Sequence, residues 1–374
     1  MRVLFVNSVC GIGSTGRICA DLAGEYASLG HEVKIAYGRD GTVPDTCRQY
    51  AVRIGNDLDV RLHVIKSQLL DEHGLGSAGA TEKFLKWADE YDPDILWLHN
   101  IHGYYIHYEL LFDWIKKRPN MEVKWTLHDC WAFTGHCSYF TIAKCDKWKT
   151  QCEHCPQPKK YPARLLFDNS RRNYARKKKA FCGVRNLKII TPSKWLAGLV
   201  KESFLSEYPV EVVYNTINRD VFKPTASDFR ERRGLEDKKI ILGVASPWDE
   251  RKGLEAFLWL SGRLDDSYRI VLVGLSRDQI KKIPSDIIGI ERTDNVQELV
   301  SIYTAADVFV NPTHEDNYPT TNLEAAACGT PVVTYHVGGS PESVLPENVV
   351  EENDLEGLLA RILFLTEQRR AQHA

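Results

Sequence analysis

The sequence has no run of about 18 apolar residues, so it predicts no transmembrane helix. It also has no excess of charge of one sign. Its 48 Lys and Arg residues against 50 Asp and Glu give a formal net charge of −2, and nothing indicates general nucleic-acid binding. The apolar run at residues 1–7 is far too short for a signal peptide and is typical of a first strand. We therefore expect a cytoplasmic protein.

Ten cysteines are present, and without an export signal they favour reduced thiols or a metal over disulfides. Four of them share one segment, spaced Cys137-x7-Cys145-x6-Cys152-x2-Cys155. A CxxC pair with two further thiols can form a tetrahedral zinc site that staples a long loop. Such a zinc ion would be structural, because four sulfurs leave no open position. Four unligated thiols or a redox CxxC are the alternatives.

Short apolar runs alternate with helical patterns along the 374 residues, which is typical of an α/β fold. Two series of strands predict two Rossmann-like doubly wound domains, at residues 1–217 and 225–374, joined by a linker at 218–224. Predicted helices include Ile18–Leu29 and Ser193–Ser203. The predicted strands are Val3–Asn7, Val33–Tyr37, Ile95–His99, Val123–His128, Leu187–Thr191, Val210–Tyr214, Lys239–Ala245, Arg269–Gly274, Ile287–Glu291, Val308–Asn311 and Val332–Tyr335.

Two carboxylates follow the predicted strand Val308–Asn311: Asp316 in a loop, and Glu324 in the first turn of a helix. In an open α/β sheet, ligands bind at this edge. Helix N-terminal amides there can hold a phosphate, while a carboxylate can hold ribose or sugar hydroxyls. However, Thr321–Glu324 also fits a capping box, in which Glu324 only satisfies a backbone amide. Gly329 suits the C-terminal cap of this helix.

The segment from Asp316 to Val333 closely resembles the nucleotide-sugar site of glycosyltransferase family 4, with an acid, seven residues, Glu324 and then Ala-Ala-Ala-Cys-Gly-Thr-Pro-Val-Val. Family members usually carry Glu at both ends of the spacing, whereas Asp316 holds the first position here, with Glu315 beside it. The resemblance covers nearly the whole chain. It is carried further by Thr191–Ser193, residues 213–224, Thr293–Asn295, Tyr303-x-x-Ala306-Asp307 and Gly338–Glu342.

This resemblance implies a GT-B fold, with two Rossmann-like domains facing across a cleft, and retaining transfer without a catalytic metal. The second domain would bind a UDP- or GDP-sugar, and the first would bind the acceptor. Colanic-acid and other bacterial surface-polysaccharide enzymes look most similar. The resemblance makes Asp316 a catalytic carboxylate. It places substrate contacts at Glu315, Asn317, Tyr318, Pro319, Thr320 and Glu324.

Positive charge is needed where a diphosphate leaves a sugar. Arg251-Lys252-Gly253 follows the first strand of the second domain. There the family has a lysine just before glycine, usually with an arginine upstream, so we expect Lys252 to serve the phosphates and Arg251 to replace that arginine. Read alone, such a sequence is more often a solvated turn.

Histidines follow two strands of the first domain, at His99 and His128. His128 is similar to the family's histidine near the donor sugar and acceptor. It would steady hydroxyls or developing charge without acting as a nucleophile. A hydrogen-bonded structural histidine is the alternative, and we favour it for His99.

Residues 11–16 match the dinucleotide fingerprint GxGxxG, so a dehydrogenase is a rival interpretation. Ser8–Cys10 lengthens the preceding turn, whereas the fingerprint needs its first glycine at the end of the strand. We prefer a flexible loop that faces the cleft and brings Gly13, Gly16 and Arg17 near the donor phosphates or the acceptor. The alternative is an ordinary loop in which a hydroxyl between the glycines caps the helix.

Residues 159–179 contain nine Lys or Arg and one Asp, interleaved with Tyr161, Leu165, Leu166, Phe167 and Tyr174. We expect peripheral contact with the inner face of a membrane. A solvated helix face or binding of a phosphorylated acceptor are the alternatives. The sequence as a whole predicts transfer of a hexose to a glycan or lipid-linked saccharide in polysaccharide biosynthesis. A sugar-nucleotide epimerase on the same fold and a non-catalytic nucleotide-sugar-binding subunit are the rival functions.

Overall fold

The computed structural model describes residues 1–39 and 41–373, and it divides into two compact units. Unit 1 comprises residues 1–214 and unit 2 residues 215–374. The sequence analysis placed the end of the first domain at residue 217. Residues 218–224, expected to be a linker, fall in unit 2, where Phe222 packs into a core.

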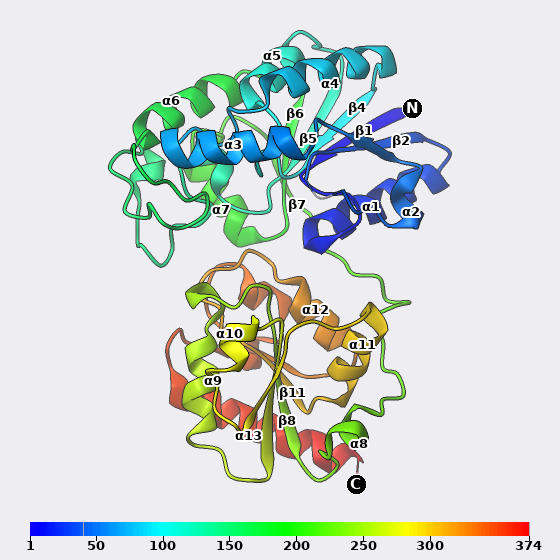
Figure 1. Cartoon of the computed structure of the whole chain (residues 1–374), viewed down its shortest axis with the longest axis vertical. Coiled ribbons are helices and arrows are strands. Elements are labelled where there is room, and N and C mark those ends of the chain that lie inside the picture. Colours follow the sequence, from blue (N-terminus) through cyan, green and yellow to red (C-terminus); the bar gives the residue numbers. More distant parts are fainter. Residues whose placement is uncertain (40, 374) are drawn as a thin grey trace. The chain divides into compact units, whose positions relative to one another are not determined.

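Unit 1 is built on a parallel seven-stranded sheet with the order β3-β2-β1-β4-β5-β6-β7 (Figure 1). Its strands are β1 (Arg2–Asn7), β2 (Glu32–Tyr37), β3 (Ala51–Arg53), β4 (Ile95–Leu98), β5 (Glu122–Thr126), β6 (Leu187–Thr191) and β7 (Val210–Val212). Its helices are α1 (Gly13–Ser28), α2 (Asp45–Arg48), α3 (Asp57–Leu70), α4 (Ala78–Tyr91), α5 (Tyr108–Lys116), α6 (Ser170–Phe181) and α7 (Lys194–Glu202), with 3-10 turns η1 (Trp131–Phe133) and η2 (Lys147–Lys149).

Side chains of β1 alternate between two cores, because successive residues of a strand point to opposite faces. Val3 and Phe5 pack on the face covered by α1, while Leu4 and Val6 pack on the face covered by α4 and α5. Both faces are therefore buried, as a doubly wound parallel sheet requires.

Unit 2 repeats the plan with a parallel six-stranded sheet of order β10-β9-β8-β11-β12-β13. Its strands are β8 (Lys239–Val244), β9 (Tyr268–Val273), β10 (Ile287–Ile290), β11 (Val308–Asn311), β12 (Val332–Tyr335) and β13 (Val349–Val350). Its helices are α8 (Phe229–Arg233), α9 (Leu254–Ser261), α10 (Arg277–Ile280), α11 (Val296–Ala305), α12 (Thr320–Ala327) and α13 (Leu355–His373), with 3-10 turns η3 (Glu250–Lys252), η4 (Ser340–Ser343) and η5 (Pro346–Asn348). One core lies under α9 and α13, and the other under α8, α11 and α12.

The predicted doubly wound α/β fold is confirmed, and each predicted strand is present with its ends shifted by at most two residues. The sequence analysis missed β3 and β13, which lie at sheet edges. With three and two residues, they are too short for the alternation of a strand to show. No helix in the described part of the chain is both long and apolar enough to cross a membrane.

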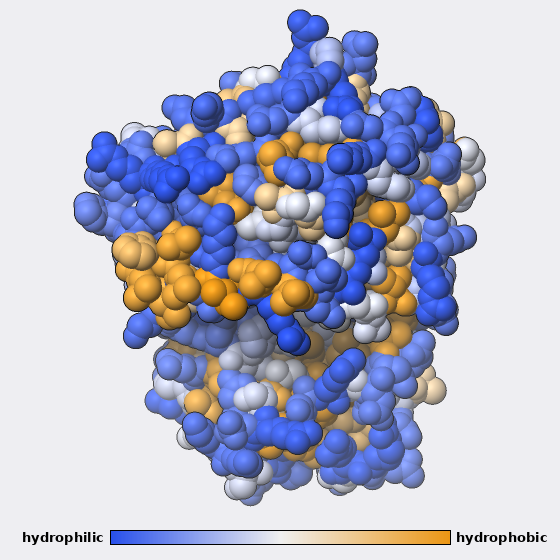
Figure 2. All heavy atoms as spheres, turned by 45° about the horizontal axis from the view of Figure 1, so that its top comes forward, coloured by the Kyte–Doolittle hydropathy of each residue, from blue (hydrophilic) through white to orange (hydrophobic). Residues whose placement is uncertain are grey.

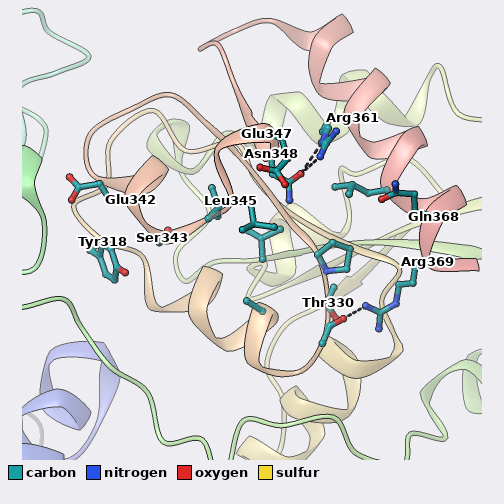
Figure 3. A pocket seen from close by; sticks show the side chains of 16 residues that line it. Tyr318, Thr330, Glu342, Ser343, Leu345, Glu347, Asn348, Arg361, Gln368 and Arg369 are labelled. Atoms are coloured by element: carbon teal, nitrogen blue, oxygen red, sulfur yellow. Dashed lines mark hydrogen bonds between the residues drawn. The ribbon is translucent and has the colours of Figure 1, made fainter. Parts of the chain in front are cut away.

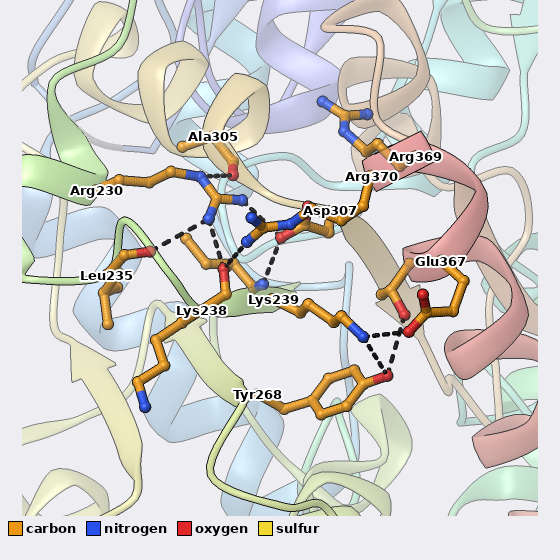
Figure 4. Close-up of polar contacts among 12 residues, drawn as sticks. Arg230, Leu235, Lys238, Lys239, Tyr268, Ala305, Asp307, Glu367, Arg369 and Arg370 are labelled. Atoms are coloured by element: carbon orange, nitrogen blue, oxygen red, sulfur yellow. Dashed lines mark hydrogen bonds and ion pairs between the residues drawn. The ribbon is translucent and has the colours of Figure 1, made fainter. Parts of the chain in front are cut away.

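Asp307 binds side chains of helices α8 and α13 at the amino ends of the unit 2 strands (Figure 4). Its Oδ2 atom accepts hydrogen bonds from Arg230 Nη2 at 2.5 Å and from the backbone N–H of Ile240 at 2.6 Å. Arg370 of α13 lies 3.3 Å from Oδ1. Because Asp307 precedes β11, this cluster is structural and lies at the opposite end of the strand from Asp316.

Candidate functional site

The strand order of unit 2 reverses between β8 and β11, so the loops that follow these strands diverge from a switch point. Ligands in open α/β sheets bind outside the carboxyl ends of the strands at such a point. Lys252 follows β8 and Asp316 follows β11. The topology therefore brings together two residues that the family resemblance had marked in separate segments of the sequence.

Lys252 and Asp316 form an ion pair, with Nζ 2.5 Å from Oδ2. Their side chains are 18% and 13% exposed, so the pair is largely shielded but still reachable from solvent. The other carboxylate oxygen of Asp316 accepts a hydrogen bond from the backbone N–H of Asn317 at 2.9 Å. A cation and a carboxylate are thus held in fixed positions at the switch point.

Arg251 ties the same two loops together through backbone contacts. Its Nη1 donates to the carbonyl of Glu315 at 3.1 Å, and its own carbonyl accepts from the N–H of His314 at 2.8 Å. A Cβ on Gly253 would lie 2.0 Å from the carbonyl oxygen of Pro312, so glycine is required at this close approach. In this arrangement Arg251 positions the loop that carries Asp316.

Glu324 is buried in α12 and accepts a hydrogen bond from the hydroxyl of Tyr303 at 3.1 Å. The capping-box interpretation of Thr321–Glu324 is wrong. The helix begins at Thr320 with Pro319 in the N-cap position, so Thr321 already lies inside the first turn. The prediction for the other end is confirmed, because Gly329 follows the C-cap with φ of +80°.

The remaining predicted contacts occupy the approach to α12. Glu315 and Asn317 are buried, and Thr320 is the first residue of the helix. The carbonyl of Tyr318 accepts from Asn215 Nδ2 at 3.2 Å. The contacts of Arg251 with Glu315 and of Asn215 with Tyr318 therefore hold this segment in place, which suits a rigid ligand-binding loop.

A buried amide network beneath this loop was missed by sequence reasoning. Asn322 Oδ1 accepts from Asn311 Nδ2 at 2.8 Å, and Asn322 Nδ2 donates to Ser343 Oγ at 2.8 Å. The Oγ atom of Ser340 lies 2.7 Å from Oγ1 of Thr334, and Ser340 belongs to the same network. The motif Gly338–Glu342 was the feature of the sequence that could have indicated this network. Its Ser340 contributes to the hydrogen bonds that hold α12.

A cavity of about 810 Å³ also borders this region, and its lining includes Tyr318 but neither Lys252 nor Asp316 (Figure 3). Tyr318 and Glu342 lie at one side of it, and α13 residues line the other. Arg361 is engaged by the Asn348 side chain at 2.8 Å and 2.5 Å, and Arg369 by the carbonyl of Gly329. Because these guanidinium groups serve the fold, the candidate site is assigned to the switch-point loops instead.

In unit 1, the strand order reverses between β1 and β4, and two histidines lie beside that point. His99 Nδ1 is 3.0 Å from His128 Nε2, and the rings are stacked with centroids 5.3 Å apart. Removal from water lowers the pKa of His128 to about 4, although Asp129 opposes this shift. Burial also lowers the pKa of His99 well below its usual value. Both imidazoles are therefore neutral near pH 7, and one ring donates its N–H to the ring nitrogen of the other.

Asp129 belongs to the same cluster but was not selected from the sequence. Its Oδ2 lies 3.0 Å from His102 Nε2, and His102 Nδ1 is 3.1 Å from the hydroxyl of Tyr161. Burial raises the pKa of the Asp129 carboxyl, but His102 and the N–H of Trp131 outweigh that effect and lower it overall. A carboxylate thus remains ionised next to His128. Its position just after β5 is the feature of the sequence from which Asp129 could have been selected.

The glycine-rich segment is not the flexible loop that we expected. Helix α1 begins at Gly13, so Gly13, Gly16 and Arg17 lie in its first turns. Ile12 is the N-cap and makes no side-chain cap hydrogen bond, so the alternative with a capping hydroxyl is also wrong. A Cβ on Gly16 would lie 2.9 Å from Val9 Cγ2. The absence of a side chain therefore lets the helix start pack against the preceding turn.

The four clustered cysteines Cys137, Cys145, Cys152 and Cys155 line one small cavity of about 20 Å³. The Cys137 thiol donates a hydrogen bond to Cys155, which lowers the pKa of the Cys155 thiol. None of the ten cysteines, all within the described residues, forms a disulfide. Within residues 1–39 and 41–373, no group of three or more His, Cys, Asp or Glu side chains is arranged to hold a metal ion. Zinc therefore stays a prediction.

Residues 15–221 match the family model described as Glycosyltransferase Family 4, and residues 238–368 match that of Glycosyl transferases group 1. The chain therefore belongs to glycosyltransferase family 4. A relative named as a colanic acid biosynthesis glycosyl transferase, WcaC of Escherichia coli K12, is 25% identical over 264 residues. That match covers 67% of this chain and 62% of WcaC, so the chain spans about three fifths of its relative's length.

Two solved structures share the fold. Sucrose-phosphate synthase from Thermosynechococcus elongatus has a TM-score of 0.69 at 16% identity, covering 99% of this chain and 90% of that one. HepE from Anabaena in complex with UDP-glucose has a TM-score of 0.63 at 14% identity, covering 99% and 91%. Together with the two parallel sheets, these likenesses establish the GT-B fold.

Proposed function

We propose that this protein is a retaining glycosyltransferase that moves a hexose from a UDP- or GDP-sugar to a saccharide or lipid-linked saccharide in polysaccharide biosynthesis. The observation that carries the proposal is the Lys252–Asp316 pair at the switch point of unit 2. Membership of family 4 and the likeness to WcaC support it. The structure of HepE with UDP-glucose favours a uridine nucleotide as the first donor to test.

In the proposed reaction, the bond between the anomeric carbon and the diphosphate breaks while the acceptor oxygen attacks the same face of the sugar. The acceptor proton passes to an oxygen of the leaving phosphate, which serves as the base. Lys252 stabilises the charge that develops on the diphosphate. No catalytic metal is required in this scheme, because the cation is supplied by the side chain.

The carboxylates have separate roles in the proposal. Glu324 accepts hydrogen bonds from the ribose, and its contact with Tyr303 sets its orientation. Asp316 contacts the transferred sugar and holds Lys252 in place when no donor is bound. Unit 1 binds the acceptor, where the neutral His128 donates to or accepts from hydroxyl groups. We place the reaction on the cytoplasmic side of the membrane.

A thermal-shift screen of nucleotide sugars tests donor binding, because a ligand that binds only the folded state raises its melting temperature. UDP-glucose and GDP-mannose form the first pair of probes. Transfer is then measured with the donor that binds and a panel of saccharide acceptors. If none of the nucleotide sugars raises the melting temperature, the proposed function is wrong.

The two rival functions give different products. A sugar-nucleotide epimerase converts the nucleotide sugar alone, without an acceptor, into its epimer. A non-catalytic subunit binds the nucleotide sugar but neither transfers nor hydrolyses it. Chromatography of the nucleotide sugars before and after incubation, with and without acceptor, separates the three outcomes.

A further inference from the structure

Helix α3 turns an apolar stripe toward solvent. Leu58, Leu62, Ile65 and Leu69 recur at a spacing of three or four residues and so lie on one face of the helix. Their exposed fractions run from 39% to 63%. Leucine and isoleucine at this spacing normally face a core. An outward stripe therefore points to a surface that is covered by something else.

Polar contacts on the opposite face hold α3 in this orientation. His63 is 1% exposed, and its Nε2 atom accepts hydrogen bonds from the backbone N–H groups of Gly74 and Gly76, each at 3.1 Å. Its Nδ1 atom is 3.0 Å from the hydroxyl of Ser77. Because these inward bonds would be lost if the helix rotated, the leucines are fixed in their outward position.

A second apolar element adjoins the end of α3. The loop residues Leu165, Leu166 and Phe167 are 69%, 65% and 56% exposed. The loop is joined to the helix by the N–H of Leu165, which donates to the carbonyl of Gln68 at 2.8 Å. Figure 2 shows an elongated apolar band on this face, framed by hydrophilic side chains. We call it the docking face. It consists of Leu58, Leu62, Ile65, Leu69, Leu70, Leu165, Leu166 and Phe167.

Basic residues flank the docking face in the sequence: Arg61 and Lys66 on α3, and Lys159, Lys160, Arg171 and Arg172 before and after the loop. The neighbouring acids are held in ion pairs. Glu72 lies 3.0 Å from Lys66, and Asp168 lies 3.0 Å from Arg164. Residues 159–172 hold five Lys or Arg and one acid, Asp168, so the loop end of the docking face carries a positive surplus. On α3, by contrast, Asp57 and Asp59 balance Arg61 and Lys66.

We propose that the docking face binds the surface of an anionic phospholipid bilayer. An exposed apolar stripe with a cationic border matches an interfacial helix, in which apolar side chains enter the headgroup and acyl boundary while basic groups attract anionic lipids. Helix α3 then lies along the membrane surface, and Leu165, Leu166 and Phe167 insert at its end. Charge complementarity favours this partner over a second copy of the chain, which would bring an equally cationic rim against the first.

This surface differs from the stretch that the sequence indicated. Within residues 159–179, Tyr174 and Lys177 are buried, and Arg176 makes a bidentate pair with Glu109. These three residues of α6 therefore serve the fold. The docking face instead uses the beginning of that stretch together with α3, which the sequence analysis did not select.

The inserted loop also connects to the histidine cluster of unit 1. Tyr161 precedes the apolar tip, and its hydroxyl is 3.1 Å from His102 Nδ1, while His102 contacts Asp129. A membrane bound at the tip therefore lies close in structure to the proposed acceptor side. This link to a lipid-linked acceptor rests on the proposed function, whereas membrane binding does not.

Co-sedimentation of the full chain with vesicles tests the proposal. One vesicle set is phosphatidylcholine alone, and the other contains phosphatidylglycerol as well. We expect binding that is stronger on the anionic vesicles and that weakens as salt rises. Leu165→Ser with Phe167→Ser should lower the partition coefficient by roughly 10-fold or more. Lys159→Glu with Lys160→Glu should lower it about 5-fold per residue on the anionic vesicles.

Leu29→Ser is the matched control, because Leu29 is 68% exposed in unit 1 but lies outside the docking face. It should bind vesicles as the unchanged chain does. Equal binding by the unchanged chain and the Leu165→Ser/Phe167→Ser variant overturns the proposal, as does an absence of binding to anionic vesicles. Self-association that the same variant abolishes, without vesicle binding, assigns the face to a second copy and also overturns it. Donor binding in the thermal-shift screen reports on the proposed function separately.

Discussion

The Nζ atom of Lys252 lies 2.5 Å from Oδ2 of Asp316, although 64 positions separate these residues in the sequence. They meet because β8 and β11 are neighbours at the point where the strand order of unit 2 reverses. The pair keeps a cation at the switch point before any donor binds. Under the proposed function, a diphosphate that enters there takes over the cation, which frees the carboxylate to contact the sugar.

Replacing Lys252 tests this relationship. Lys252→Ala should lower turnover by roughly 100- to 1,000-fold, because it removes the cation that stabilises the leaving diphosphate. Steady-state transfer assays with a saturating donor measure the change. Lys281→Ala is a matched control, since that side chain is 77% exposed in the same unit. Turnover near that of the unchanged chain in Lys252→Ala would refute the assignment.

Substitutions of the two carboxylates should affect different steps, nucleotide binding for Glu324 and sugar transfer for Asp316. Glu324→Ala should weaken nucleotide binding by roughly 10-fold, because hydrogen bonds to a charged acceptor are lost. Asp316→Ala should leave nucleotide affinity nearly unchanged and mainly impair sugar transfer. Calorimetric titration with UDP or GDP, combined with transfer assays, distinguishes the two.

Tyr303→Phe controls for the buried contact of Glu324, because it removes the hydroxyl at 3.1 Å but keeps the carboxylate. We expect it to bind nucleotide better than Glu324→Ala does. If Glu324→Ala and Asp316→Ala only lower the melting temperature, with binding and turnover intact, both residues are structural.

Acid should destabilise unit 1 through His63. Burial lowers the pKa of His63 to about 3 in the folded chain, from an ordinary value of 6.5. Above pH 6.5 both states are neutral and the group has no effect. Between pH 6.5 and about 3 only the unfolded chain takes up the proton, so the free energy of unfolding falls by about 1.4 kcal/mol per pH unit for this group.

Urea denaturation at pH 7.5 and pH 5.0 measures that slope. His63→Leu should be less stable at both pH values, because the N–H groups of Gly74 and Gly76 lose their acceptor. Its stability should nevertheless fall less between the two pH values than that of the unchanged chain. An identical fall in both proteins would contradict the assignment of this titration to His63.

Zinc in the cysteine segment is tested by metal analysis of protein purified without chelator. We expect about one zinc per chain, and we expect Cys152→Ser with Cys155→Ser to abolish it and lower the melting temperature, because the metal would staple the loop. Cys182→Ser is the control, since Cys182 is a partly exposed cysteine outside the cavity. A zinc content well below one per chain would contradict the prediction of a structural zinc site.

The chemistry of the candidate site was visible in the sequence one residue at a time. Lys252 and Asp316 lie in the loops that follow two apolar strands, Glu324 lies in the helix after the second of them, and the family resemblance marked all three. Asn322 and Asp129 were missed because their roles depend on partners far away in the sequence. The helix start at Gly13 was missed because glycine is a poor helix former. The structure shows that Gly13 has a φ of +63°, a conformation that favours glycine, and that Gly16 packs closely against Val9.

The sequence by itself determined the doubly wound fold, the strands and the residues that follow them, because alternation and strand-end position are local properties. Only the tertiary structure decided what those residues contact. It paired Lys252 with Asp316, placed His128 against His99, and left the leucines of α3 facing outward. The last of these could not be read from the helix alone, since an apolar stripe at this spacing ordinarily faces a core. The buried hydrogen bonds of His63, made with residues beyond the end of the helix, reversed that expectation.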